Sequence, residues 1–354
     1  MTARPLNCAL IGLGMVAETH VRALADLKET VRLCGVLART EESAKRFGKK
    51  VAPILGESPH CYPSVQAIAD DGALDFVIIA TPPDARAELV DILSGASKNI
   101  LMEKPVERTK AAALSIVEMC EQRDVMLGIV FQHRMRAASR AMSKLLAVGT
   151  LGDLGLVDVR VPWWRDQSYY NEPGRGTLAR DGGGVLISQA IHTLDLMLSF
   201  TGPVREVQAM ASTTALHAME TEDHVSAGLS FANGAVGSLV ASTACFPGAA
   251  ESITLHGSKA SAVLEAGTVT LTHRNGETET FGETAATGGG ADPMAFTHEW
   301  HRDVIADFAH GIVGNHAPMV TGREALAVHR LIDALVTSSA EKRMATLGPE
   351  GDAP

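Results

Sequence analysis

The sequence predicts an α/β protein of two domains. An N-terminal Rossmann domain with a doubly wound parallel sheet is followed by an α+β domain with a large, open and mainly antiparallel sheet. The chain has 354 residues, which is more than most single cores accommodate. Apolar runs alternate with helical patterns up to about residue 130. Strand-like segments with Asn-Gly turns predominate after that point.

The first domain is expected over residues 1–130. Short apolar runs indicate five buried strands, at 6–12, 31–38, 73–83, 99–103 and 125–130. Helical patterns of ~10–15 residues follow the first four runs. Strands connected by such helices run parallel, with helices on both faces of the sheet.

The second domain is expected over residues 131–320. An amphipathic helix within 134–155 opens it, and Asn233-Gly234 and Asn275-Gly276 each predict a tight turn between antiparallel strands. The Gly-rich stretch 282–293 predicts a flexible loop. The last segment, 321–354, predicts a helix that packs back onto one of the two domains, followed by a tail.

The composition excludes several classes of partner. A net charge of −10 without a basic run argues against binding to nucleic acid or to a membrane surface. The five cysteines lie far apart, with no C-x-x-C pair, as in a reduced cytoplasmic protein. No apolar run approaches the ~20 residues of a membrane span, and the N-terminus lacks a signal-peptide pattern. We therefore expect a cytoplasmic protein that acts on a small molecule.

A glycine motif, G-x-G-x-x-A, lies between the first predicted strand and the first helix. Gly12 permits a tight turn, Gly14 has no Cβ to keep a pyrophosphate away, and Ala17 allows close packing. The helix N-terminus, which begins around Met15 and Val16, would offer backbone N–H groups to phosphates. The alternative is an ordinary turn, but the position in a βαβ series favours dinucleotide binding.

The end of the second strand bears on the choice between NAD and NADP. An NAD enzyme usually has a carboxylate there, whereas this chain has Ala38, Arg39 and Thr40. Arg39 would bind a 2′-phosphate through its guanidinium group. Alternatively, Arg39 is solvated and Glu41 or Glu42 binds the ribose. The pattern favours NADP over NAD.

The carboxyl ends of parallel strands meet at one edge of a sheet, where ligands bind. Gly12, Thr81-Pro82 and Glu103-Lys104 all follow predicted strands, so we expect them around one cofactor site. Pro105 restricts Lys104 to extended conformations and would aim its ammonium group at that site.

These motifs resemble those of the glucose–fructose oxidoreductase / inositol dehydrogenase / rhizopine-catabolism (Gfo/Idh/MocA) family. The similar segments are "GLGMVAETH" (12–20), "MEKPVERT" (102–109), "GGGVLISQAIHTLDLML" (182–198) and "GREALAVHRLIDALVTSS" (322–339). The resemblance spans roughly residues 6–340. It implies a Rossmann domain with NAD(P), an open-sheet domain, and oxidation of a sugar or cyclic polyol.

Two residues are candidates for catalysis. Histidine suits a base that removes the hydroxyl proton, and His192 lies three positions before Asp195 on one predicted helix face. Lys104 would stabilise the negative charge that develops on the same oxygen. Taken alone, His192 is more simply explained as a packed helix histidine. Lys104 and the glycine motif favour catalysis.

The chain departs from the family pattern at two positions. Inositol-type members have Asp four residues before the histidine, whereas this chain has Ser188, followed by Gln189. Either side chain would still hold the imidazole through a neutral hydrogen bond. The other departure is Arg86, where the family often has histidine. The sequence assigns Arg86 no role.

Scarce aromatic residues gather in "WWRDQSYY" (163–170), which indicates either a carbohydrate-binding wall or core packing. The candidate substrate-binding residues are Lys104, Arg134, Trp163, Trp164, Arg165, Tyr169, Tyr170, Arg175, Ser188, Gln189 and His192. "HEWH" (298–301) lacks the H-E-x-x-H spacing, so no metal is expected. A homodimer or homotetramer is expected, because open antiparallel sheets often pair across subunits.

Other activities remain compatible with these motifs. A trans-dihydrodiol or sugar-nucleotide dehydrogenase would share the fold. A non-catalytic NAD(P)-binding regulator is a further alternative, although the presence of both Lys104 and His192 argues against it.

Overall fold

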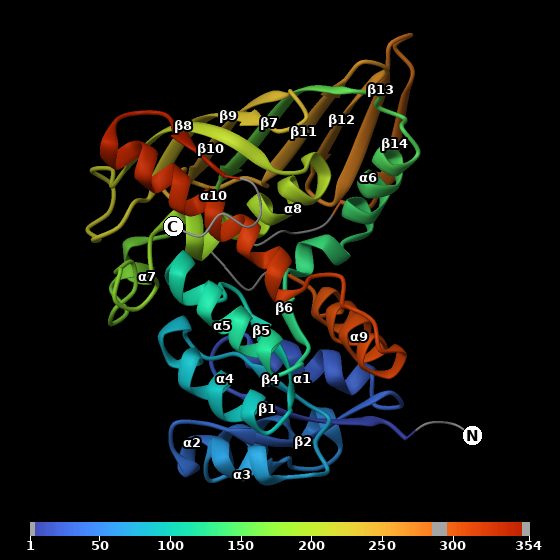
Figure 1. Ribbon diagram of the computed structural model, residues 1–354, viewed down its shortest axis with the longest axis vertical. Helices are drawn as coiled ribbons and strands as arrows, with labels where there is room; N and C mark the ends of the chain where they lie inside the picture. The colour runs from blue at the N-terminus through green and yellow to red at the C-terminus, as the bar shows by residue number, and fades with distance from the viewer. Residues whose placement is uncertain (1–3, 285–295, 349–354) are drawn as a thin grey trace. The chain divides into compact units, whose positions relative to one another are not determined.

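The computed structural model describes residues 4–284 and 296–348. The chain divides into two compact units (Figure 1). Unit 1 comprises Met1–Gln132 and Thr297–Leu326, and unit 2 comprises His133–Phe296 and Ala327–Pro354. Unit 1 therefore includes a segment from late in the chain, whose helix α9 (Glu299–Gly314) packs against α1 (Ala17–Asp26).

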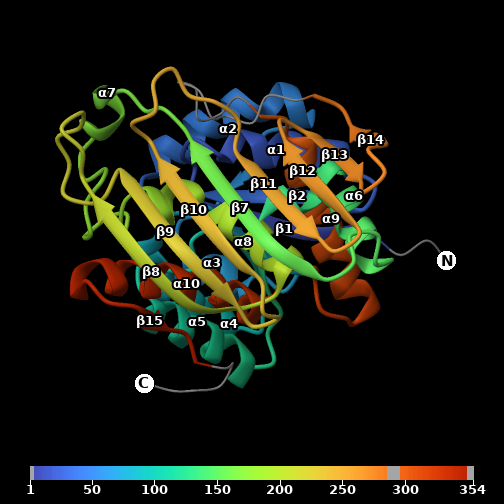
Figure 2. The same cartoon turned by 90° about the horizontal axis from the view of Figure 1, so that it is seen from above.

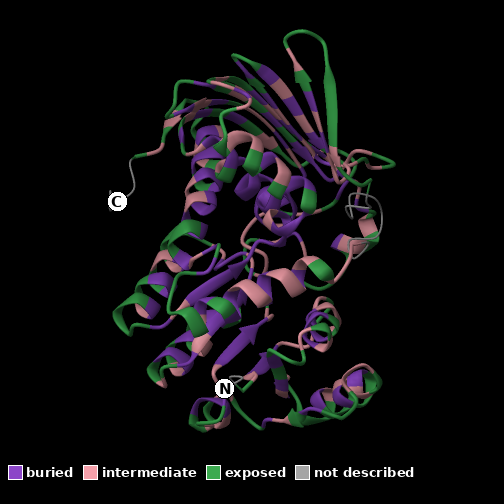
Figure 3. Ribbon diagram, turned by 90° about the vertical axis from the view of Figure 1, so that its right-hand side faces the viewer, coloured by how far each residue is buried: buried purple, intermediate pink, exposed green. Residues whose placement is uncertain are grey.

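Unit 1 contains a six-stranded parallel sheet, which confirms the Rossmann prediction. Its strand order is β3-β2-β1-β4-β5-β6. The strands are β1 (Leu6–Ile11), β2 (Val31–Leu37), β3 (His60–Cys61), β4 (Phe76–Ile79), β5 (Asn99–Glu103) and β6 (Leu127–Val130). The order reverses direction between β1 and β4, which is the switch point where dinucleotides bind in this fold. All four residues of β4 are buried, as expected for a central strand covered on both faces (Figure 3).

The helices of unit 1 begin at sequence signals that are easily read. They are α1, α2 (Glu41–Leu55), α3 (Val65–Asp70), α4 (Arg86–Gly95), α5 (Lys110–Gln122) and α9. Thr40, Ser64 and Thr109 precede α2, α3 and α5, and each accepts a hydrogen bond from the backbone N–H three residues later. A short turn, η1 (Pro83–Ala85), leads into α4.

Unit 2 contains a nine-stranded sheet in the order β14-β13-β12-β11-β7-β10-β9-β8-β15 (Figure 2). The strands are β7 (Leu154–Pro162), β8 (Val204–Ser212), β9 (His224–Phe231), β10 (Val236–Ser242), β11 (Ser252–Gly257), β12 (Ala260–Glu265), β13 (Thr268–His273), β14 (Thr278–Gly282) and β15 (Ala345–Thr346). Only β7 and β10 pair in parallel among these strands, so the sheet is mainly antiparallel as predicted. Both Asn-Gly hairpins are confirmed, between β9 and β10 and between β13 and β14.

The two faces of this sheet differ. Helices α6 (Ala137–Ala147) and α8 (Ile191–Thr201) pack against one face. Exposed apolar side chains lie on three strands of the sheet: Leu156 on β7, Val236 and Val240 on β10, and Met210 on β8. The predicted C-terminal helix is also confirmed, as α10 (Gly322–Glu341).

Two strands of the unit 2 sheet were not predicted, and one predicted loop is mostly outside the described residues. Two strands without a strong apolar alternation, β12 and β15, extend the predicted sheet. Most of the predicted loop 282–293 lies outside the described residues.

None of the helices in the described part of the chain combines the length and the apolar character that a bilayer span requires.

The backbone is most tightly packed in unit 2 at Gly184. Replacing Gly184 by alanine is expected to lower the free energy of unfolding by about 3 kcal/mol, because the added Cβ would lie 1.7 Å from the carbonyl oxygen of Glu222. Denaturant unfolding of the full chain measures this change. Gly228→Ala in β9 is the control, since no neighbouring atom of the described residues lies within 4 Å of its added Cβ. Equal losses for the two variants would contradict the expectation.

Candidate active site

The glycine loop of unit 1 forms an open cradle next to a helix terminus. Gly12 has φ +93°, and an added Cβ there would lie 2.6 Å from the backbone of Ala80 and Thr81. At Gly14, by contrast, no described atom lies within 4 Å of an added Cβ. Helix α1 begins directly after this loop, and none of the described side chains caps its N-terminus. The loop can therefore receive the pyrophosphate of a dinucleotide.

Thr81 supplies a polar group beside this cradle. It follows β4, next to the glycine loop, and its Oγ1 is buried without a hydrogen-bond partner among the described residues. Buried hydroxyl groups are normally hydrogen-bonded, so this one fits a ligand that brings a partner. Met15 is half exposed and Pro82 is exposed at the same edge. The residues present fit a dinucleotide.

Ala38, Arg39 and Thr40 follow β2, as the sequence predicts. The side chain of Arg39 is exposed. Thr40 uses its hydroxyl oxygen to accept from the backbone N–H of Ser43, which caps α2. Glu41 forms an ion pair with Lys45. Arg39 is therefore the residue of this group whose charge is presented to solvent at the end of β2.

Glu103, at the end of β5, is a buried carboxylate held by two histidines. Its Oε1 lies 2.8 Å from His20 Nε2 and 3.5 Å from His301 Nε2. Burial alone would raise the pKa of Glu103, but the hydrogen bonds and charges of the two imidazoles outweigh it and hold this pKa well below its usual range. Burial lowers the pKa of His301 despite the carboxylate. The group therefore carries an ionised Glu103 with an imidazole donor.

The same three side chains offer the chemistry of a metal site, because their ligand atoms all lie within 4.8 Å of one another. His301 belongs to the "HEWH" segment for which no metal was expected. The 2.8 Å separation between His20 and Glu103 is a hydrogen-bond distance, so the two groups satisfy each other directly.

Arg86 opens α4 and is buried, with 2% of its surface exposed. Its guanidinium group donates to the carbonyl oxygens of Thr81, Glu103 and Pro105. Burial lowers the pKa of Arg86 to about 10, and the charge of Glu103 opposes this shift. The sequence signalled this residue only through its departure from the family pattern.

In unit 2, His192 lies at the start of α8, directly after a π-helical turn, η3 (Leu186–Ala190). Its ring stacks on that of His133, with centroids 4.7 Å apart and planes at 24°. Arg136 donates to Nε2 of His133 and also pairs with Glu251. Because a guanidinium group only donates, Nε2 of His133 is an acceptor and this imidazole is neutral.

The other polar candidates near α8 are engaged within unit 2. Arg134 binds both carboxylate oxygens of Asp195, at 2.8 and 2.7 Å. Asp195 therefore orients an arginine that the sequence offered as a substrate ligand. Ser188 donates to the carbonyl oxygen of Gly184 at 2.6 Å, so this hydroxyl anchors the π-helical turn.

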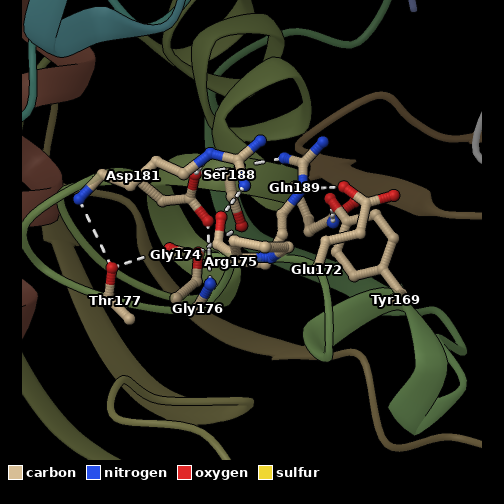
Figure 4. A network of polar contacts seen from close by, with 12 residues as sticks. Tyr169, Glu172, Gly174, Arg175, Gly176, Thr177, Asp181, Ser188 and Gln189 are labelled. Atoms are coloured by element: carbon tan, nitrogen blue, oxygen red, sulfur yellow. Dashed lines mark hydrogen bonds and ion pairs between the residues drawn. The ribbon is translucent and has the colours of Figure 1, made fainter.

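Gln189 links the helix to the aromatic cluster. Its Nε2 donates to the hydroxyl of Tyr169 (Figure 4). Its Oε1 accepts from Arg165. Arg175 lies over the ring of Tyr169, 4.9 Å from the centroid. The loop that carries Arg175 is closed by Asp181, which accepts from the backbone N–H of Gly176.

The aromatic cluster divides by burial. Trp163 and Tyr170 are buried, and Tyr170 bonds Thr243 while burial raises the pKa of Tyr170 to about 12. These two rings match the core-packing alternative. Trp164 and Tyr169 are partly exposed, so these two rings are not confined to the core.

Two family models match the chain. "Oxidoreductase family, NAD-binding Rossmann fold" matches residues 6–131, and "GFO/IDH/MocA C-terminal domain" matches residues 139–263. Together they match more than half of the chain, one model for each unit.

Curated proteins and solved structures that are similar to this chain agree with the two family models. The inositol 2-dehydrogenase of Rhizobium meliloti is 25% identical over 351 residues, covering 96% of this chain and 98% of that protein. The D-apiose dehydrogenase of Paraburkholderia graminis is 27% identical over 218 residues, covering 60% and 54%. The chain spans little more than half the length of several curated relatives that it matches. The WlbA dehydrogenase from Chromobacterium violaceum, solved with NADH and UDP-GlcNAcA, is 25% identical, with a TM-score of 0.82 and coverage of 99% and 98%.

The ordered motifs, the six-stranded Rossmann sheet and both family models agree, and the family prediction is confirmed. The chain belongs to the Gfo/Idh/MocA family of oxidoreductases.

Proposed function

We propose that the chain is an NAD(P)-dependent dehydrogenase that oxidises a secondary hydroxyl group of a sugar, an inositol or a related polyol. The observation that carries this proposal is the cradle in unit 1. Open space at Gly14, the uncapped start of α1 and the buried hydroxyl of Thr81 together match the chemistry of a dinucleotide. When bound, the nicotinamide supplies the hydride acceptor.

Lys104 is proposed to bind the reacting hydroxyl. It follows Glu103 at the carboxyl end of β5, one strand away from β4 and two away from the glycine loop after β1. Its ammonium group would donate to the substrate oxygen and stabilise the charge that develops as the hydrogen leaves.

His192 is proposed as the base that removes the hydroxyl proton. Protonation makes the ring an imidazolium, and a second positive imidazole stacked on it would oppose this step. His133 stays neutral through the hydrogen bond from Arg136, so the stack does not repel the new charge.

The substrate class follows from unit 2 and from the relatives. The partly exposed rings of Trp164 and Tyr169 lie among Arg165, Arg175 and Gln189, which suits C–H faces alternating with hydroxyl groups. The names of two relatives give inositol and D-apiose as their substrates. A sugar nucleotide is the second candidate, because the WlbA structure contains UDP-GlcNAcA.

We also propose that the protein forms a homodimer or homotetramer through the open face of the unit 2 sheet. Leu156, Met210, Val236 and Val240 expose apolar surface on that face, and such a contiguous patch usually marks an interface. Light scattering of the purified chain measures its mass in solution, and a monomer at micromolar concentration would contradict the proposal.

The activity is tested by a substrate panel. The purified chain is incubated with NAD⁺ or NADP⁺ and with inositols, hexoses, D-apiose, a trans-dihydrodiol or UDP-GlcNAcA, and nicotinamide reduction is followed by absorbance. Turnover of a free sugar or polyol supports the proposal. Turnover of the dihydrodiol or of UDP-GlcNAcA alone replaces its substrate class. Tight cofactor binding without any turnover identifies a regulator instead.

Gly14→Val tests the cradle. The added side chain meets no described atom within 4 Å of its Cβ, so the fold should be unaffected. It would occupy the space proposed for the pyrophosphate, so dinucleotide affinity should fall by ~10²-fold or more. Calorimetric titration measures the affinity, and thermal unfolding without cofactor checks the fold. Unchanged affinity would place the dinucleotide elsewhere.

Lys104→Ala tests the oxyanion role. We expect kcat/KM for the polyol to fall by ~10²–10⁴-fold while the Kd of the cofactor stays within about threefold. Lys110→Ala is the control. It also removes an ammonium group, but from an exposed lysine at the start of α5. Full activity in the Lys104 variant would refute the assignment.

Arg39→Asp tests the cofactor preference. The new carboxylate would repel a 2′-phosphate and accept from a ribose 2′-hydroxyl, so the ratio of kcat/KM for NADP⁺ over NAD⁺ should fall by ~10-fold or more. Arg46→Asp, on the following helix α2, is the control. If the ratio does not change, Arg39 does not contact the nucleotide.

A further inference from the structure

We infer that Arg86 is a positioning residue for Lys104: it ties the backbone on both sides of Lys104 to the loop that follows β4. The inference rests on the proposed function, because it assigns Arg86 an effect through the reacting group. The sequence alone assigns Arg86 no role.

The hydrogen bonds of Arg86 converge on two loops. Nη1 donates to the carbonyl oxygens of Glu103 and Pro105, the residues immediately before and after Lys104. Nε and Nη2 donate to the carbonyl oxygen of Thr81, at 3.2 and 2.7 Å. Lys104 is thus bracketed by two carbonyl groups that bind the same nitrogen, while the other side of the guanidinium group binds the loop beside the dinucleotide cradle.

A guanidinium group is specifically suited to this task. It is planar and presents donors in a fixed fork, whereas the ammonium group of lysine is a point charge with rotating donors. Arg86 is buried, and desolvating a charge is costly unless it is hydrogen-bonded. An apolar side chain would fill this space more cheaply, so the burial of a cation indicates that its fixed directions matter.

The backbone of Arg86 is itself held in place by a helix. Arg86 is the first residue of α4, and η1 connects that helix to Thr81 within five residues. The side chain therefore extends from the first turn of a helix to the loop after β4 and to the loop after β5. If Arg86 were only a structural brace, its removal would weaken the fold and every activity equally. A positioning role predicts an effect that disappears when Lys104 is absent.

A double-mutant cycle separates these two roles. In the full chain, Arg86→Ala is expected to lower kcat by ~10–10²-fold with a smaller change in the KM of the cofactor. In the Lys104→Ala background, the same substitution should lower kcat by less than about threefold. Equal losses in both backgrounds would overturn the inference.

Two further variants keep the test informative if Arg86→Ala folds poorly. Arg86→Lys keeps a cation and loses the fork, so it should remain folded and still lose kcat. Arg123→Ala is the control, because Arg123 also donates to a backbone carbonyl oxygen, that of Asp91 in α4, and it does not bind the backbone next to Lys104. Added methylguanidine should restore part of kcat to Arg86→Ala and none to Lys104→Ala. Full activity in Arg86→Lys would overturn the inference.

A last measurement does not depend on turnover. Lysines are labelled by reductive ¹³C-methylation, and the Lys104 resonance is identified by its loss in Lys104→Ala. Arg86→Lys should shift and broaden this resonance, whereas Arg123→Ala should leave it unchanged. If the wild-type chain turns over no substrate in the panel, the proposed activity fails, and this resonance still reports whether Arg86 positions Lys104. An unshifted resonance overturns the inference independently.

Discussion

The parallel pairing of β1, β4 and β5 is the constraint on which the nucleotide site depends. Ile11 pairs with Ile79, and Ile79 pairs with Met102, so three strands end at the same level of the sheet. That register delivers the glycine loop, Thr81 and Lys104 to one edge of the sheet. A slip of one residue in the register of β5 would turn each of its side chains to the other face of the sheet and would displace Lys104 from its present position. The apolar burial of these strands therefore fixes the positions of polar groups that contribute little to the core.

Both units bury charged groups and satisfy them with hydrogen bonds. Unit 1 buries a carboxylate, Glu103, beside imidazoles, and buries a cation, Arg86, among carbonyl oxygens. Unit 2 also places a buried carboxylate, Asp223, against the imidazole of His217. In addition, unit 2 pairs arginines with carboxylates, as in the bidentate contact of Arg134 with Asp195 and the contact of Arg136 with Glu251. The hydrogen bond from Arg136 leaves the imidazole of His133 neutral, and this imidazole stacks on the ring of His192.

Most of the fold is predictable from local patterns in the sequence. The glycine motif, the alternation of strands with helices and both Asn-Gly turns are contiguous signals, and the structure confirms them. Contacts between distant residues leave no such signal. His301 reaches Glu103 from almost two hundred residues away, and Glu251 reaches Arg136 across more than a hundred. Arg86 was visible as an unusual residue, but its three carbonyl partners depend on how two loops approach each other.

The π-helical turn η3 lies immediately before α8, the helix that carries His192. A π turn has more residues per revolution than an α-helix, so it changes the direction of the side chains before Ile191 relative to an uninterrupted α-helix. Within this turn, the hydroxyl group of Ser188 donates to the carbonyl oxygen of Gly184. An ionised carboxylate at position 188 could accept hydrogen bonds but could not donate this one. The hydroxyl of Ser188 is therefore part of the local backbone geometry as well as a polar group close to His192 in the chain.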